Sequence, residues 1–297
     1  MSVVQGIGQR IRQAISDVGR SDAAATTGRG QVLAIAAQKG GVGKTTTAVS
    51  LAVGLATGHR LRVLLVDLDN QGHVASSLRD HMRATAIETV STVLLAREPD
   101  MTRAAVPTTI DGLWVTGADR QLAHTEAQLA SRIGRDLLLR RALANARGRF
   151  DLIVIDCPPN LGLLTVNALV AADQVLVPCD LSILSLEGVD GLIETLRNLE
   201  ISFGRAPEVL GLLHTRVDRR NVRHNAAIRT AVAARYAGFA LATEIGVNTA
   251  LADAQLHGRS IFHAHPDSRG AADYRALAAE VAPRLGVPAV PAVRQAV

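Results

Sequence analysis

A glycine-rich loop between an apolar run and a helix-forming stretch constrains the fold more than any other feature of this sequence. The loop reads Lys-Gly-Gly-Val-Gly-Lys-Thr-Thr from Lys39 to Thr46 and directly follows the apolar run 32–37. Glycines let the backbone curl so that its N–H groups can face a phosphate, and the following helix adds the partial positive charge of its first turn. A strand, such a loop and a helix in this order are typical of an α/β protein with a mainly parallel sheet.

Both lysines of the chain lie in this loop. Of the 32 basic residues, all are arginine except Lys39 and Lys44. A general preference for arginine accounts for the others, but the two exceptions indicate a chemistry that needs a compact ammonium group on a flexible stem. We expect Lys44 to bridge the β- and γ-phosphates of a nucleotide and Thr45 to bind Mg²⁺, whereas a glycine turn without a ligand is the alternative. The nucleotide-binding residues predicted in the loop are Lys39, Gly40, Gly41, Val42, Gly43, Lys44, Thr45 and Thr46.

Short β-branched runs alternate with helix-forming stretches along the rest of the chain. The predicted strands are residues 32–37, 62–67, 113–116, 150–156, 174–178, 209–215 and 240–245. The predicted helices are residues 44–57, 120–146, 161–171, 185–199, 225–236 and 269–285. This alternation predicts one α/β domain over residues 31–286, with a mainly parallel twisted sheet and helices on both faces. Residues 1–30, which include a basic amphipathic pattern over 3–18, are predicted to be an appendage, and residues 287–297 a loose tail.

Acidic residues end two of the predicted strands. Asp67 and Asp69 lie two residues apart at the end of one strand and are expected to share a face that points toward the phosphates. Asp156 ends another apolar strand, where a carboxylate can hold Mg²⁺ through water. Since ligands of an open α/β sheet bind at the carboxyl ends of its strands, we predict a metal site from Thr45, Asp69 and Asp156. A pair of solvated acids at the strand end is the alternative for Asp67 and Asp69.

These motifs together resemble the deviant Walker A class of P-loop NTPases, which contains ParA, MinD and the nitrogenase iron protein. The resemblance rests on the early Lys39 of the loop, on the Asp-Leu-Asp-Asn-Gln-Gly segment 67–72 and on the Ile-Asp-Cys-Pro-Pro segment 155–159, and it spans about residues 32–285. It implies ATP and Mg²⁺ as cofactors and an ATP-dependent homodimer in which Lys39 reaches the partner's nucleotide. It further implies that Asp69 orients the attacking water, so that Lys39, Lys44 and Asp69 are the predicted catalytic residues. The adenine is expected near Thr215 and Val247.

A short basic segment suggests a partner for the domain. Residues 216–235 carry six arginines against the single acid Asp218, while the whole chain has a net charge of +5. We expect Arg219, Arg220 and Arg223 to contact DNA phosphates without reading bases. Aromatic residues make up only 2% of the chain, which disfavours base stacking as a binding mode. A solvated helix face or internal salt bridges are the alternatives for these arginines.

Three functions remain open at this point. The first is a ParA-type partition ATPase that acts in the cytoplasm on the nucleoid, with a ParB-like activator protein. The second is a MinD-like ATPase that cycles on a membrane. The C-terminal tail is too short and too interrupted by proline to form the amphipathic anchor that the MinD family uses, but the possible N-terminal helix keeps this alternative open. The third is a metabolic enzyme with the same loop, although Cys157 and Cys179, in apolar runs without a Cys-x-x-Cys spacing, indicate neither a disulfide nor a metal cluster.

Overall fold

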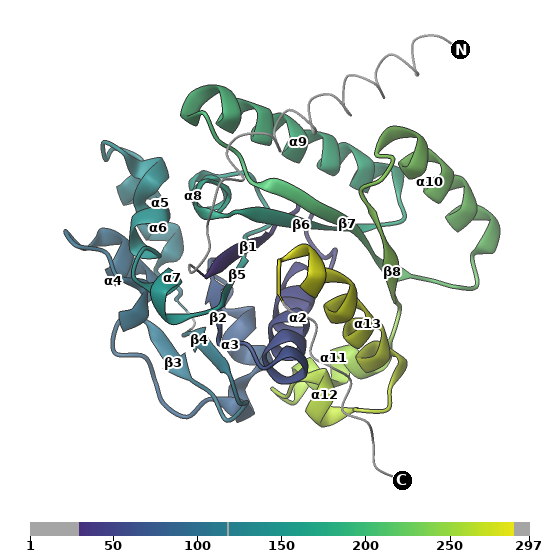
Figure 1. Cartoon of the computed structure of the whole chain (residues 1–297), viewed down its shortest axis with the longest axis horizontal. Helices are drawn as coiled ribbons and strands as arrows, with labels where there is room; N and C mark the ends of the chain where they lie inside the picture. The colour runs from purple at the N-terminus through teal and green to yellow at the C-terminus, as the bar shows by residue number, and fades with distance from the viewer. Residues whose placement is uncertain (1–29, 118, 288–297) are drawn as a thin grey trace.

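The computed structural model of the chain describes residues 30–117 and 119–287, so the predictions for 1–29 and 288–297 lie outside the described residues. These residues form one eight-stranded sheet with the strand order β3-β4-β2-β5-β1-β6-β7-β8, covered by helices on both faces (Figure 1). Neighbouring strands are parallel except β3, which pairs antiparallel with β4. The strands are β1 (Gln31–Ile35), β2 (Val63–Asp67), β3 (Ala105–Pro107), β4 (Leu113–Thr116), β5 (Leu152–Asp156), β6 (Gln174–Asp180), β7 (Glu208–Val217) and β8 (Ala240–Gly246). The predicted fold class is confirmed.

The helices connect these strands as crossovers. The longer ones are α2 (Lys44–His59), α5 (Leu122–Leu129), α8 (Leu163–Ala171), α9 (Ile183–Phe203), α10 (Val222–Arg235), α11 (Thr249–Leu256) and α13 (Arg269–Arg284). Short helices are α3 (His73–Ser77), α4 (Val90–Leu95), α6 (Leu138–Ala142), α7 (Ala146–Arg149) and α12 (Ile261–Ala264), with 3-10 turns η1 (Arg79–His81), η2 (Met101–Arg103) and η3 (Arg135–Leu137).

The central strands are apolar on both faces because each face is covered by helices. Along β2, Leu64 and Val66 belong to the core under α8 and α9, whereas Val63 and Leu65 belong to the core under α2 and α13. All five residues of β2 are buried. This double burial fixes the strand register, because a slip by one residue would exchange the two sets of side chains.

Several predicted elements differ from the structure. The single helix predicted over residues 120–146 is wrong: α5 ends at Leu129, Gly134 with a left-handed φ of 72° precedes η3, and α6 ends at Ala142. The strand β7 continues two residues beyond the predicted end at Thr215, to Val217. The antiparallel β3 was not predicted, since it has only three residues and contains Pro107.

Candidate functional site

The sheet brings the predicted motifs to one edge. The loop 39–46 joins β1 to α2, and Asp156 at the end of β5 pairs in register with Ile35 of β1 on one side and with Asp67 of β2 on the other. Because β5 lies between β1 and β2, the phosphate loop and both acidic strand ends lie beside one another at the carboxyl edge of the sheet. This is the edge at which open α/β sheets bind ligands.

Left-handed glycines shape the loop around the lysine that ends it. Gly41 and Gly43 have φ values of 74° and 83°, which residues with a Cβ adopt only at a cost. The ammonium group of Lys44 is buried and donates a hydrogen bond of 2.9 Å to the carbonyl oxygen of Lys39. Burial lowers the pKa of Lys44, although Asp156 acts against this shift. The loop therefore curls around a cation that lies inside the site.

The other lysine of the loop is held by an acid that sequence reasoning missed. Lys39 Nζ lies 2.7 Å from Asp180 Oδ2 and also donates to Ser182 Oγ at 3.3 Å. Burial alone would raise the pKa of Asp180, but hydrogen bonds from Lys39, Ser182 and Ser185 outweigh it and keep that pKa below its usual value. The only signal in the sequence is the position of Asp180 at the end of a strand, β6, that shares the carboxyl edge with the loop.

The surroundings of the Asp156 carboxylate favour a bound cation. Its side chain is fully buried, and neither carboxylate oxygen has a hydrogen bond in the described part of the chain. Burial, which the nearby Asp69 reinforces, outweighs the opposite effects of the Thr45 hydroxyl and the Lys44 ammonium and raises the pKa of Asp156 to about 7. A buried carboxylate with two free oxygens beside a hydroxyl fits Mg²⁺, which takes few protein ligands and completes its octahedron with water and phosphate oxygens. Residues 30–117 and 119–287 contain no group of three or more His, Cys, Asp or Glu side chains that could hold a metal ion.

The raised pKa of Asp156 predicts a pH-dependent stability of the nucleotide-free protein. A carboxyl group whose pKa rises on folding contributes stability below its unfolded pKa of about 4, and this contribution is lost as the pH rises through its folded pKa of about 7. Because one pKa unit corresponds to about 1.4 kcal/mol, the loss reaches about 4 kcal/mol at pH 8. We expect the melting temperature of D156N without Mg²⁺ to exceed that of the wild type, and by more at pH 8 than at pH 5. Calorimetry at both pH values measures this difference, with the exposed D111N as control; an equal gain at both pH values would contradict the prediction.

The two acids at the end of β2, which are expected to face the phosphates, have different surroundings. Asp67 is buried, and its carboxylate accepts hydrogen bonds from the backbone N–H groups of Asp69 at 3.0 Å and Val74 at 3.2 Å. Burial, followed by the charge of Asp156, raises the pKa of Asp67. Asp69 is half-buried and accepts a hydrogen bond from the Gln71 N–H at 3.0 Å. Asp67 therefore supports the turn, and Asp69 is the acid left at the site.

The residues predicted near the adenine lie in different places. Thr215 is buried in β7, and its hydroxyl donates to the carbonyl oxygen of Val42 at 2.7 Å, so it supports the phosphate loop from the sheet. Val247 follows β8 and is 63% exposed, with its N–H donating to the carbonyl oxygen of Val217. The structure thus gives Thr215 a definite contact with the loop and leaves Val247 on the surface beside β7.

Most charges of the basic segment have partners inside the chain. Arg219 lies 3.4 Å from Asp273, and Arg220 lies 2.8 Å from Asp218. Two further arginines of the segment form ion pairs, Arg229 with Glu244 and Arg235 with Asp190. Arg223, on the first turn of α10, is exposed and has no ion pair with a described residue. The free positive charge of the segment is therefore smaller than the sequence indicates.

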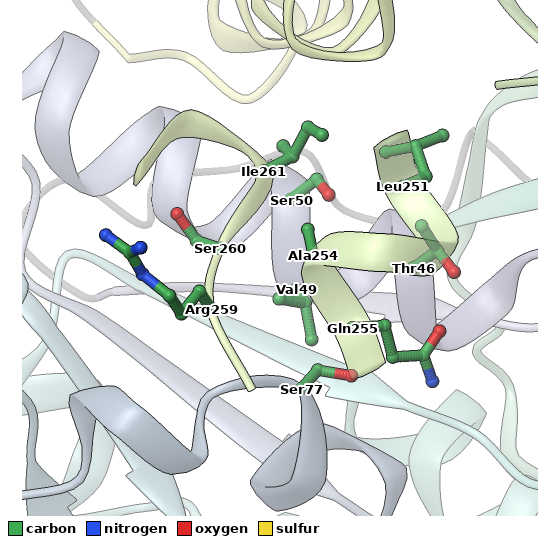
Figure 2. Close-up of a pocket in the computed structure, with 10 residues that line it drawn as sticks. All are labelled: Thr46, Val49, Ser50, Ser77, Leu251, Ala254, Gln255, Arg259, Ser260 and Ile261. Atoms are coloured by element: carbon green, nitrogen blue, oxygen red, sulfur yellow. The ribbon is translucent and has the colours of Figure 1, made fainter. Parts of the chain in front are cut away.

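A small cavity borders the first turns of α2. It has a volume of about 20 Å³ and lies between α2, α3 and α11, with Thr46, Ser50, Ser77 and Gln255 among its lining residues (Figure 2). This space accommodates about one water molecule. The cavity is therefore too small for a nucleotide.

Within residues 30–117 and 119–287, no helix has the length and apolar character that a membrane span requires. Burial raises the pKa of both thiols, that of Cys179 to about 12, so neither is suited to act as a thiolate ligand of a cluster.

The strand, the glycine loop with its buried lysine, and the carboxylates at the neighbouring strand ends define a nucleotide-binding P-loop protein. A family model described as an AAA domain matches residues 30–206. The sporulation initiation inhibitor protein Soj of Bacillus subtilis is 39% identical to the chain, covering 85% of it and 98% of Soj. The chromosome partitioning protein ParA of Caulobacter vibrioides is 37% identical to the chain, and the match covers 86% of this chain and 94% of ParA. The chain therefore belongs to the family of P-loop ATPases that contains Soj and ParA.

One solved structure is similar in both sequence and fold. Cobyrinic acid a,c-diamide synthase of Mycobacterium smegmatis, with bound ADP and magnesium, has a TM-score of 0.70 and 38% sequence identity. The similar region covers 84% of this chain and 92% of that one.

Proposed function

We propose that this chain is a partition ATPase that binds ATP with Mg²⁺, dimerises around the nucleotide, binds DNA without sequence preference and hydrolyses ATP when a ParB-like protein stimulates it. Such a cycle would act on the nucleoid in the cytoplasm. The observation that carries the proposal is the position of Lys39, the first residue of the phosphate loop, at the rim of the site. Lys39 is partly exposed and pairs with Asp180 across the rim of the site, so it is free to exchange that partner for a nucleotide on another subunit.

Each residue of the site has a separate role in the proposed ATP binding and hydrolysis. Lys44 and the N–H groups of the loop bind the β- and γ-phosphates, and Asp69 accepts a hydrogen bond from the attacking water and orients it. Thr45, Asp69 and Asp156 would hold Mg²⁺. When bound, Mg²⁺ neutralises the charge that develops on the phosphate oxygens. Lys39 adds a positive charge at the transferring phosphate from the second subunit, as an arginine finger does.

The basic segment supports DNA binding through phosphates alone. Arg223 has no partner among the described residues, while Arg219 and Arg220 are exposed and form ion pairs that solvent weakens. Exchange of such a surface partner for a DNA phosphate costs little, so all three arginines remain available to DNA. Two subunits in a dimer would double the number of these contacts.

Binding to random-sequence duplex DNA tests this proposal. We expect the full-length protein to bind with ATP, but not with ADP or without nucleotide, and to bind more weakly as salt rises. The substitution R223A should weaken binding to every sequence and reduce the slope of log affinity against log salt by about 1 per subunit, because each phosphate contact releases counterions. The matched control is R97A, since Arg97 is exposed and without an ion pair among the described residues but lies after α4, at the opposite end of the sheet. ATP-independent binding, or equal losses for R223A and R97A, would refute the proposal.

Two other functions are separated by parallel assays. Anionic liposomes in place of DNA test membrane cycling, and binding to them alone would favour that function. The 38% identity to the diamide synthase favours an ATP-dependent amide synthase as the second candidate. That function predicts ADP release that depends on a carboxylic acid and an amine donor and is indifferent to DNA.

A further inference from the structure

An arginine at the end of β7 has a backbone conformation that is unusual for a strand. Arg216 has a φ of 52°, and the described part of the chain has only one other residue besides glycine with a positive φ, Arg60. Arg60 ends helix α2, where the left-handed conformation is common. Arg216 instead lies within a strand, and its conformation is unfavourable for any residue with a Cβ. Strain of this kind persists where the surrounding structure enforces it and is concentrated at functional sites.

The strained residue lies in an irregularity of the sheet. The pairing of β7 with β8 changes register between His214 and Val217. Consecutive residues of a regular strand point to opposite faces of the sheet, but a bulge redirects a side chain. Here both Thr215 and Arg216 reach the phosphate loop: Thr215 Oγ1 donates to the carbonyl oxygen of Val42 at 2.7 Å, and Arg216 Nη1 donates to that of Gly41 at 3.0 Å. Two consecutive strand residues therefore hold two consecutive carbonyl groups of the loop.

These hydrogen bonds act on the part of the loop that determines its shape. The left-handed Gly41 and Gly43 lie on either side of Val42, and alternation of this kind turns N–H groups toward a common concave side. When the carbonyl groups of Gly41 and Val42 are held toward β7, the loop cannot turn them into the space that an anion needs. The Arg216 guanidinium also adds a positive charge beside the loop, because its side chain is exposed and has no carboxylate partner among the described residues.

From this arrangement we propose that Arg216 is a positioning residue for nucleotide binding, which holds the phosphate loop through Gly41 in the shape that receives the triphosphate. This role rests on the proposed binding of ATP but not on DNA partition. It differs from the role of the nearby arginines 219, 220 and 223, which are proposed to contact DNA.

The test uses glycine, which removes the guanidinium and the backbone strain together. We expect R216G to have a melting temperature no more than about 3 °C below that of the wild type. It should nevertheless bind a fluorescent ATP analogue about fivefold to tenfold more weakly, as the loss of one hydrogen bond with a charged donor predicts. Because Lys39, Lys44 and Asp69 are unchanged, kcat at saturating ATP should stay within about threefold of the wild-type value. R216K, which keeps a positive donor, should bind the analogue within about threefold of wild type.

Arg60 provides the matched control. R60G relieves the same left-handed conformation, at a φ of 56°, at the end of α2 far from the loop, and should leave nucleotide affinity unchanged. An R216G protein with wild-type affinity for ATP would overturn the proposal, whatever its affinity for DNA. A wild-type protein that binds ATP but not DNA would refute only the partition function, whereas one that binds no ATP would refute both proposals.

Discussion

Replacement of Asp69 by alanine is expected to lower kcat by about 100-fold or more while ATP affinity stays within about threefold of the wild type. Whereas both carboxylate oxygens of the buried Asp67 accept a backbone hydrogen bond of the turn, the carboxylate of Asp69 accepts one, at Oδ1. Its loss removes the group that orients water but leaves Lys44 and the loop intact. Phosphate release at saturating ATP and titration with a fluorescent analogue measure the two quantities, and size-exclusion chromatography should find the ATP-bound dimer accumulating.

Two further variants separate catalysis from folding of the turn. D69N keeps an oxygen that can accept the hydrogen bond from the Gln71 N–H, so it preserves the turn but removes the charge. We expect it to lose turnover as D69A does. D111A removes an exposed acid before β4, far from the site, and should behave as wild type. Undiminished turnover in D69A would refute the catalytic assignment.

The parts of the fold that were predictable are those in which local pattern and global packing agree. The buried strands β1, β2, β5 and β6 are continuous apolar runs, as parallel strands covered on both faces must be. The stretch 120–146 lacks proline and is rich in helix-forming residues, so nothing in it except Gly134 marks the break. Whether a single glycine interrupts a helix depends on what the two parts pack against, and this packing is not contained in the local sequence.

The site, like the fold, depends partly on residues that are adjacent in the sequence and partly on contacts between residues that are far apart in it. The loop and its lysines follow from local sequence, because their chemistry is concentrated in eight consecutive residues. The partner of Lys39 is Asp180, which is 141 residues away, and only the sheet order brings the two together. Similarly, the basic segment loses most of its free charge to Asp190, Glu244 and Asp273, which are supplied by α9, β8 and α13. Charge counted along a segment overestimates the field at its surface whenever such partners come from other elements.

The same limitation applies to Asp67. Strand alternation predicts that residues two apart share a face, but β2 ends at Asp67, so the alternation does not extend to Asp69. The turn after β2 brings the N–H of Val74, at the start of α3, back to the carboxylate. Because Asp67 is also buried, its carboxylate is less accessible to a ligand than that of the half-buried Asp69. The hydrogen bonds of the folded turn thus distinguish Asp67 from Asp69, the acid that the family resemblance indicates as catalytic.

The second large effect concerns the subunit on which Lys39 acts. K39A alone is expected to bind ATP but to lose at least about 100-fold in kcat, because the positive charge at the transferring phosphate is missing. Removal of Lys39 also leaves the Asp180 carboxylate without its ion-pair partner. The separate variant D180A should therefore be measured beside K39A, because it removes the carboxylate and keeps Lys39. D180A should retain turnover if the pair with Asp180 only holds the lysine between reaction cycles.

A mixture of two inactive variants distinguishes action within a subunit from action across the dimer. In a heterodimer of K39A and D69A, the site of the K39A subunit keeps its own Asp69 and would receive Lys39 from the D69A partner. If subunits exchange freely in an equal mixture, half of the dimers are heterodimers with one complete site each, so turnover should recover to about a quarter of the wild-type rate. If Lys39 acts within its own subunit, neither site of the heterodimer is complete and the mixture stays inactive. Recovery in the mixture therefore requires that the nucleotide lies between two subunits, which is the arrangement that makes ATP hydrolysis a switch for dimerisation.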